Sequence, residues 1–179
     1  MILCVSRFVR EKGLENLILA FAELRKRHKD WTLRIVGPIV DAAYRSELEL
    51  LISRLGLEDS VFVIPDATEE ELQKEYLIAT LFCLPSLKES FGSARVEAAA
   101  NGLPVITTDV PCEIDLHRSG YLIVPPGSIS ALERGLEELI TQPTLRESRL
   151  ARQAAGIRTY EQLTLEFLAT LSDPHSKGS

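Results

Sequence analysis

Short apolar segments alternate with amphipathic segments along the chain, and this alternation restricts the possible folds more than any other feature. Six apolar segments are rich in Val, Ile, Leu and Phe and too short for helices, which is typical of buried strands. They cover residues 1–6, 31–37, 60–64, 81–85, 103–108 and 121–126. Because most of them are separated by helical segments, right-handed crossovers are expected to place the helices on both faces of a parallel sheet.

The intervening segments repeat apolar residues at helical spacing. The segment 14–28 carries one apolar stripe opposite its charges, and Thr68 followed by Glu71 is a capping-box pattern at a helix start. The predicted helices cover 14–28, 44–55, 68–80, 91–102, 128–141, 144–156 and 159–171. The sequence therefore predicts the α/β class: a Rossmann-like three-layer α/β/α domain with a mostly parallel six-stranded sheet. We expect one domain over 1–171 and a disordered tail over 172–179.

The bulk composition excludes several classes of protein. The chain has 179 residues, 45% hydrophobic and 26% charged, which suits one globular domain. No apolar run is long enough for a membrane span, and the net charge of -6 argues against a nucleic-acid partner. Three cysteines without close spacing indicate neither a disulfide framework nor a zinc site, so we expect a reducing, cytoplasmic location.

In an open parallel sheet, ligands bind beyond the carboxyl ends of the strands, so the loops that follow the strands are the places to search. The loop after the first predicted strand holds Arg7 and Lys12, with Gly13 at the start of the next helix. A guanidinium and an ammonium beside a helix N-terminus can hold a diphosphate. Arg10 lies in the same loop, and taken alone the loop is better interpreted as a solvated basic surface.

The loop after the fourth predicted strand leads into an alanine-rich helix. Glu89 lies in the loop, and Phe91 or Gly92 is expected to begin the helix, so that its first amides, at residues 92–94, can bind an anion. Glu97 lies further along this helix. A carboxylate there could accept hydrogen bonds from ribose hydroxyls, or could simply lie on the exposed stripe of an amphipathic helix.

Other polar residues give weaker signals. Asp109, Glu113 and Asp115 follow the fifth predicted strand and either bind sugar hydroxyls or decorate a loop. His117 is interpreted as a surface or capping histidine, and Cys112 as a loop thiol. The sequence contains no P-loop, no ordinary dinucleotide fingerprint after the first strand and no pattern typical of a metal site. Any phosphate charge would therefore be neutralised by basic side chains and a helix N-terminus.

Several linked motifs resemble the C-terminal, donor-binding domain of retaining GT-B glycosyltransferases of the group 1, family 4 type. The resemblance runs through "VSRFVREKGLENLILAF", "LRIVGP", "YRSELELLISRLGLEDSVFV", "EEELQKEYLIATLFCLPSLKESFGSARVEAAANGLPVITTD" and "SGYLIVPPG". Together these motifs reverse the interpretation of the first loop as a plain basic surface. The resemblance implies a nucleotide-diphospho-sugar as substrate, with UDP, GDP or ADP as the nucleotide, and glycosyl transfer with retention.

The resemblance also assigns roles to individual residues. Arg7 and Lys12 match the family's diphosphate ligands, and the backbone around Gly92, Ser93 and Ala94 is expected at the phosphate. The family's motif of two glutamates separated by seven residues matches Glu89 and Glu97. Glu89, the expected catalytic residue, is placed near the donor sugar's hydroxyls, and Glu97 on the nucleotide ribose. No cofactor and no metal ion are expected.

The chain departs from the family pattern in three places. Pro65 stands where the family usually has glycine near the base, and Pro111 with Cys112 replaces a glycine pair after the fifth strand. The family's N-terminal domain, which binds the acceptor glycan or lipid, has no counterpart here. We therefore expect weak nucleotide-sugar binding without transfer by the chain alone, in the cytoplasm or, for a full-length enzyme, at a membrane surface. The alternatives are a stand-alone binding module or a partner subunit, and a GT-B epimerase is disfavoured.

Overall fold

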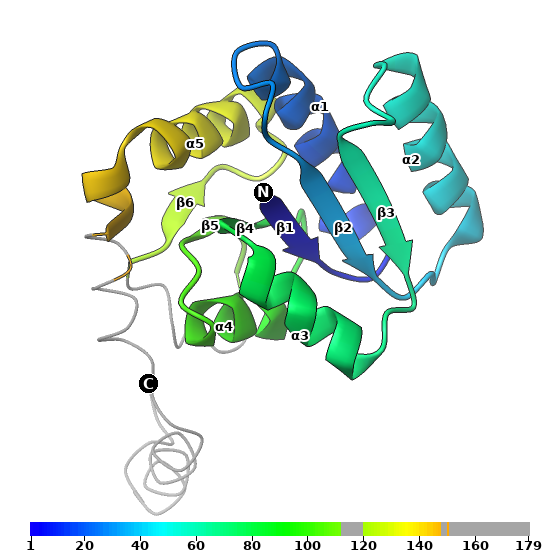
Figure 1. Ribbon diagram of the computed structural model, residues 1–179. Coiled ribbons are helices and arrows are strands. Elements are labelled where there is room, and N and C mark those ends of the chain that lie inside the picture. The colour runs from blue at the N-terminus through cyan, green and yellow to red at the C-terminus, as the bar shows by residue number, and fades with distance from the viewer. Residues whose placement is uncertain (112–119, 148–149, 151–179) are drawn as a thin grey trace, which may run out of the picture.

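Six parallel strands form the centre of the computed structural model, in which residues 1–111, 120–147 and 150 are described (Figure 1). The strands are β1 (Ile2–Val5), β2 (Leu33–Gly37), β3 (Val61–Pro65), β4 (Leu81–Leu84), β5 (Val105–Thr108) and β6 (Leu122–Val124). They lie in the order β3-β2-β1-β4-β5-β6, and every ladder among the described residues is parallel. The predicted fold class is confirmed, with a sheet that is parallel throughout this part of the chain.

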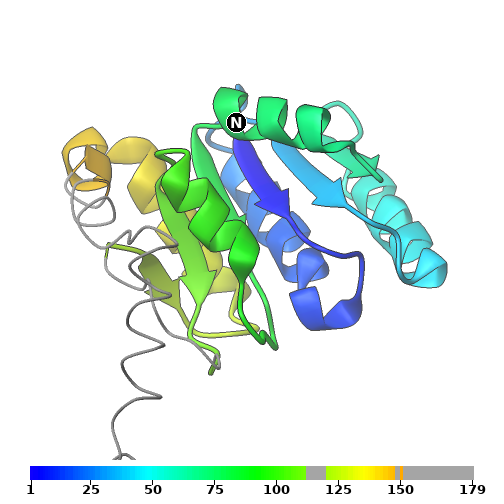
Figure 2. The ribbon, with the colours of Figure 1, turned by 90° about the horizontal axis from the view of Figure 1, so that it is seen from below.

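Helices cover both faces of the sheet, as expected for right-handed crossovers. The described helices are α1 (Leu14–Arg25), α2 (Ala42–Arg54), α3 (Glu69–Ile78), α4 (Ser93–Ala100) and α5 (Ile129–Thr141). Apolar residues of α1, α2 and α5 join one buried cluster, and those of α3 and α4 join another. Figure 2 shows this layering, with α3 on one side of the strands and α1 and α2 on the other.

The strand order reverses direction between β1 and β4. From β1 the chain moves outward to β2 and β3, then returns to lay β4 against the free edge of β1, with Ile2 opposite Leu81 and Leu3 opposite Phe82. The helix after β1 and the helix after β4 pack on opposite faces of the sheet. The loops after these two strands therefore diverge and leave a crevice. This position is where ligands bind in open α/β sheets.

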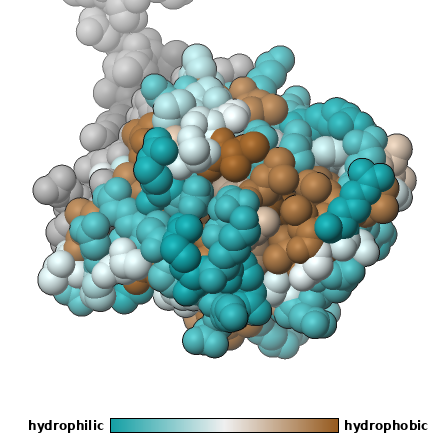
Figure 3. Space-filling model, turned by 90° about the horizontal axis from the view of Figure 1, so that it is seen from above, coloured by the Kyte–Doolittle hydropathy of each residue, from teal (hydrophilic) through white to brown (hydrophobic). Residues whose placement is uncertain are grey.

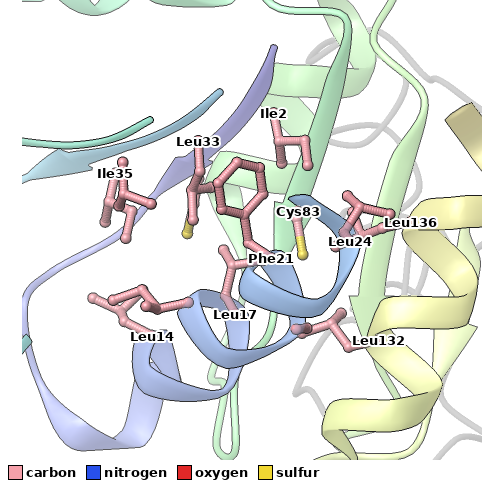
Figure 4. Packing of buried hydrophobic residues seen from close by; sticks show 14 of the residues in the cluster. Ile2, Leu14, Leu17, Phe21, Leu24, Leu33, Ile35, Cys83, Leu132 and Leu136 are labelled. Atoms are coloured by element: carbon pink, nitrogen blue, oxygen red, sulfur yellow. The ribbon is translucent and has the colours of Figure 1, made fainter. Parts of the chain in front are cut away.

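The larger core packs α1 against the sheet and α5. Figure 4 shows Leu14, Leu17, Phe21 and Leu24 of α1 pointing toward sheet residues such as Ile2 and toward Leu132 and Leu136 of α5. These residues recur at the helical spacing that predicted the buried stripe, and the four α1 residues have no exposed surface. The core therefore fixes α1, and with it the loop that joins β1 to α1.

Helix ends agree with the sequence signals in one case and differ in another. The Thr68 hydroxyl accepts a hydrogen bond from the Glu71 amide, and Glu71 accepts one in return from the Thr68 amide, which confirms the capping box. The helix expected over 91–102 begins at Ser93 and ends at Ala100. Gly92 is the N-cap, in a left-handed conformation with φ of 72°, so the expectation that Phe91 or Gly92 starts the helix is corrected.

Some expectations fall on residues outside the described part of the chain. These are most of the helix predicted over 144–156, the helix over 159–171, and the tail over 172–179. The domain boundary at 171 stays a prediction for the same reason. Among the described residues, no helix is long and apolar enough to cross a bilayer.

One face of the molecule is mostly hydrophilic but carries an apolar area. Figure 3 shows one face on which hydrophobic residues gather into a contiguous area within polar surroundings. Large apolar side chains that are well exposed include Leu77 and Ile78 at the end of α3, with 71% and 61% of their surface accessible.

Replacing Leu17 with alanine tests the packing of α1. Leu17 is fully buried, and Leu17→Ala is expected to lower the free energy of unfolding by about 2–5 kcal/mol because it opens a cavity. Leu50→Ala on α2 is the matched control: this side chain is 51% exposed, and its loss is expected to cost less than about 0.5 kcal/mol. Urea unfolding followed by circular dichroism measures both, and equal losses would contradict the assigned packing.

Candidate functional site

The loop after β1 is short and ordered by its own hydrogen bonds. It continues into a single 3-10 turn, η1 (Arg10–Lys12), and Gly13 then joins η1 to α1 with φ of 60°. A Cβ atom at Gly13 would come within 2.6 Å of the Pro85 carbonyl oxygen, so both the conformation and the close approach require glycine. The β1 loop is therefore packed directly against the loop that follows β4.

The loop after β4 is held in place from both sides. The backbone amides of Leu87 and Lys88 donate to the Glu11 carbonyl at 2.8 and 3.1 Å. On the other side, the hydroxyl of Thr108 in β5 donates to the carbonyl of Ser86, which is buried. These contacts fix the path of the chain into α4, whose N-cap Gly92 provides no side-chain hydrogen bond to the first turn. Gly92 has no side chain that could cap the amides of Ser93 and Ala94, and amides at a helix N-terminus can bind an anion.

A cavity of about 540 Å³ lies between these two loops. The ends of β1, β2 and β4 and the first turns of α4 contribute its walls. The residues to which the family resemblance assigned a ligand contact line it: Arg7, Lys12, Glu89, Gly92, Ser93, Ala94 and Glu97. The structure therefore brings together the two loops that the sequence singled out separately.

A buried ion pair joins the two loops inside the cavity. Lys12 Nζ lies 2.9 Å from Glu89 Oε2, and the two side chains are only 9% and 8% exposed. Glu89 also accepts hydrogen bonds from the Ser86 hydroxyl at 3.1 Å and from the Ser90 amide at 3.2 Å. Burial raises the pKa of Glu89, but the hydrogen bonds and the charge of Lys12 outweigh it and leave the pKa below its usual range. Glu89 is therefore an anion held by three donors.

Arg7 has a different environment at the mouth of the cavity. Its guanidinium lies 2.9 Å from Glu11 Oε1, and both side chains are largely exposed, at 54% and 43%. Exposed pairs of this kind contribute little to stability and rearrange readily. Arg7 can therefore turn toward an anion in the cavity at low cost.

Glu97 lies on the exposed stripe of α4, with Ala98 and Ala99 on the buried side. The exposed side chain also lines the cavity, so both interpretations of this residue stay open. The hydroxyl of Tyr76, on α3, donates to Glu97 Oε2 at 3.0 Å. The carboxylate is thus neither buried in the alanine-rich face nor a solvated charge without a contact.

Sequence reasoning missed three polar residues beside the cavity. Ser86 follows Pro85 just after β4 and donates to Glu89, and its position after a strand was the available signal. Tyr76 lies on the buried side of α3, and its sequence context does not distinguish it from an ordinary core residue. Arg95 is 2% exposed, and its guanidinium donates to the Phe91 carbonyl at 3.3 Å. Nothing in the alanine-rich sequence around Arg95 distinguishes a buried arginine from a surface one.

The loop after β5 adds little to the described site. The Asp109 amide donates to the Val124 carbonyl at 2.8 Å and its side chain is exposed, while Cys112, Glu113, Asp115 and His117 lie outside the described residues. Pro65, at the end of β3, does not line the cavity.

The described cysteines are thiols, and the described carboxylates and histidines form no metal site. Cys4 and Cys83 are free, fully buried thiols, and burial raises the pKa of Cys4 to about 12. The described part of the chain contains no group of three or more His, Cys, Asp or Glu residues placed to hold a metal ion.

Comparison with known families shows which family has this arrangement. The family model described as "Glycosyl transferases group 1" matches residues 1–156. The chain belongs to this family. Its relatives include an exopolysaccharide phosphotransferase of Streptomyces coelicolor, 31% identical over 181 residues, which cover 94% of this chain and 19% of that protein.

Solved structures of other proteins share the fold. The C-terminal domain of the group 1 protein LpcC from Francisella tularensis matches with a TM-score of 0.76 and 24% identity, over 93% of this chain and 85% of that one. Anabaena HepE, solved in complex with UDP-glucose, matches with a TM-score of 0.82 and 23% identity, over 96% of this chain and 48% of HepE. These structures share the fold of this chain, which spans less than half the length of the curated relatives it matches.

The ion pair between Lys12 and Glu89 predicts a specific pH dependence. Because the pKa of Glu89 is lowered in the folded state, the pair stabilises the fold above the usual glutamate pKa of about 4.3 and loses this effect as pH falls through the folded value. We expect wild type to be more stable than Glu89→Gln at pH 7, with the difference shrinking below about pH 4. Urea unfolding at several pH values measures it, and a constant difference would exclude this coupling.

Proposed function

We propose that this chain is the donor-binding part of a retaining glycosyltransferase and that a nucleotide-diphospho-sugar occupies the cavity between the β1 and β4 loops. One observation carries the proposal: residues from two distant loops, joined by the buried contact of Lys12 with Glu89, converge on one cavity in a fold of the group 1 family. The complex of HepE with UDP-glucose supports the class of donor. Because glucose is a hexose, that complex supports a hexose as the donor sugar of this chain.

The distribution of charge suggests how the donor lies. Phosphate oxygens would be repelled by Glu89 and Glu97 and attracted by Arg7, Lys12 and the first amides of α4, which line the cavity with them. The diphosphate therefore belongs between the basic side chains and residues 92–94. Carboxylates accept hydrogen bonds from hydroxyl groups, so Glu89 is assigned to the donor sugar and Glu97 to the ribose.

The proposed reaction breaks the bond between the anomeric carbon and the diphosphate oxygen. The acceptor hydroxyl oxygen forms its bond to the same carbon on the same face, and its proton passes to the departing diphosphate oxygen. Negative charge develops on the departing diphosphate, where Lys12, Arg7 and the α4 amides would stabilise it without reorganisation. Glu89 is the catalytic residue of the proposal because its carboxylate, fixed by three donors, would hold the sugar for this step.

The acceptor, a glycan or a lipid, is assigned to an N-terminal domain of a longer protein. This assignment rests on the chain's spanning less than half of the relatives it matches. By itself the chain is expected to bind the donor and not to transfer sugar. A cytoplasmic location is part of the proposal, because the described cysteines are free thiols, as in a reducing compartment.

Arg7 and Arg10 form a matched pair for testing the diphosphate site. Both are exposed arginines of the same loop paired with a glutamate, but only Arg7 lines the cavity. In calorimetric titration of UDP, GDP, ADP and UDP-glucose, Arg7→Ala is expected to weaken the best ligand by about tenfold or more, the loss of one charge-assisted hydrogen bond. Arg10→Ala is expected to change it by less than about twofold.

Two outcomes would overturn the proposal. One is that none of the four nucleotides binds saturably to the wild-type chain. The other is that the two arginine variants bind equally well, which would move the phosphate away from the cavity wall that Arg7 forms.

The proposal also predicts that donor binding needs no divalent cation. Lys12, Arg7 and the helix N-terminus already supply the positive charge that a metal ion supplies elsewhere. Titrations of UDP-glucose in EDTA and in excess Mg²⁺ are expected to give dissociation constants within about twofold of each other. A loss of binding in EDTA that Mg²⁺ restores would contradict this expectation.

A further inference from the structure

A buried tyrosine connects α3 to the ribose end of the cavity. Tyr76 is 3% exposed and its ring packs against Phe82 of β4, with the ring centroids 6.2 Å apart. Only its hydroxyl reaches a charged group, Glu97 on α4. The ring thus has a structural role, whereas the hydroxyl makes a hydrogen bond to Glu97 that packing of the ring does not require.

The hydroxyl's single proton has one good acceptor. Tyr76 Oη lies 3.0 Å from Glu97 Oε2 and 3.4 Å from the Ala94 carbonyl. The carboxylate is both nearer and charged, so it takes the proton in a charge-assisted bond. Burial and the neighbouring Glu97 carboxylate raise the pKa of Tyr76, so the hydroxyl remains a donor throughout the physiological pH range.

An exposed glutamate without such a partner would sample several rotamers, and a ligand would have to order it at a cost in entropy. The bond from Tyr76 holds one oxygen of Glu97 before any ligand arrives. The carboxylate can still accept further hydrogen bonds, because a carboxylate has about four acceptor positions. Glu97 is thereby preorganised at the cavity wall.

We propose that Tyr76 is a positioning residue that holds Glu97 for a vicinal diol, and so gives the site its preference for ribonucleoside over deoxyribonucleoside diphosphates. This inference rests on the proposed function, since it assigns the diol to the ribose of the nucleotide. Tyr76 acts through Glu97 and has no contact with the ligand in the proposal.

Tyr121 provides a matched comparison. It is 4% exposed, belongs to the same buried cluster, and donates from its hydroxyl to the Arg95 carbonyl of α4 at 3.4 Å. Burial raises its pKa to about 12. Its hydroxyl therefore resembles that of Tyr76 in burial and in the helix it touches, and differs in binding the backbone rather than Glu97.

The test compares ribose discrimination in the full chain. UDP, GDP and ADP are each titrated beside the corresponding 2′,3′-dideoxy analogue, and the ratio of the two dissociation constants is the readout. Wild type is expected to prefer the ribonucleotide by about tenfold or more, the range for hydrogen bonds to a charged group. Tyr76→Phe is expected to reduce this ratio by about threefold or more, whereas Tyr121→Phe leaves it unchanged.

Three further variants make the test independent of how well Tyr76→Phe folds. Glu97→Ala is expected to bring the ratio close to one, and adding Tyr76→Phe to it is expected to change the ratio no further, because both act through one carboxylate. Glu97→Asp changes an exposed residue and shortens the side chain, so it cannot reach both partners. It is expected to lose most of the discrimination.

The outcomes separate this inference from the proposed function. Three outcomes would overturn the role of Tyr76 without affecting the diphosphate site. They are an unchanged ratio in a folded Tyr76→Phe, a loss of affinity by Tyr76→Phe that is equal for the ribonucleotide and its dideoxy analogue, and full discrimination by Glu97→Asp. Equal wild-type affinity for both analogues would overturn the assignment of Glu97 to ribose and the inference with it. No binding of any of the six nucleotides would overturn the proposed function as well.

Discussion

The parallel pairing of β4 with the free edge of β1 is the constraint on which the rest of the site depends. It places the loops after these two strands side by side, although their residues Lys12 and Glu89 are 77 positions apart in the sequence. Helices then lie on both sides of the sheet, so the two loops diverge around a crevice. A chain with the same loops and another strand order would have no cavity between them.

Within that crevice, the fold buries two charged groups at a cost in stability. Burying Lys12 and Glu89 requires the removal of both groups from water, and a well-packed apolar pair of similar size is often at least as stable. The cost is offset by the additional donors to Glu89 from Ser86 and Ser90. A polar arrangement of this kind in an otherwise apolar fold is typical of sites kept for binding rather than for stability. Gly13 and Gly92 nearby adopt left-handed backbone conformations, which the path of the two loops requires.

Sequence patterns predicted most of the fold because they report local physics. Strand length, helical periodicity and the Thr68 capping box each depend on residues close together in the chain. The start of α4 was misplaced because Gly92 is compatible with both a first turn and a left-handed cap, and the docking of the loop on Glu11 selects the cap. The candidate site residues were found through linked motifs. Their roles could not follow from spacing, which left Arg7 as a plausible surface charge.

The sequence by itself determined the alternation of strands and helices, the family, and the residues that meet at the cavity. Tertiary structure alone decided the environment of each one: Lys12 in a buried ion pair, Arg7 in an exposed one, and Glu97 on the exposed stripe beside a buried tyrosine. The contact of Tyr76 with Glu97 joins two helices, and helical periodicity reports only which face of each is apolar. Burial and charge pairing depend on neighbours distant in the sequence, and only the folded chain brings those neighbours together.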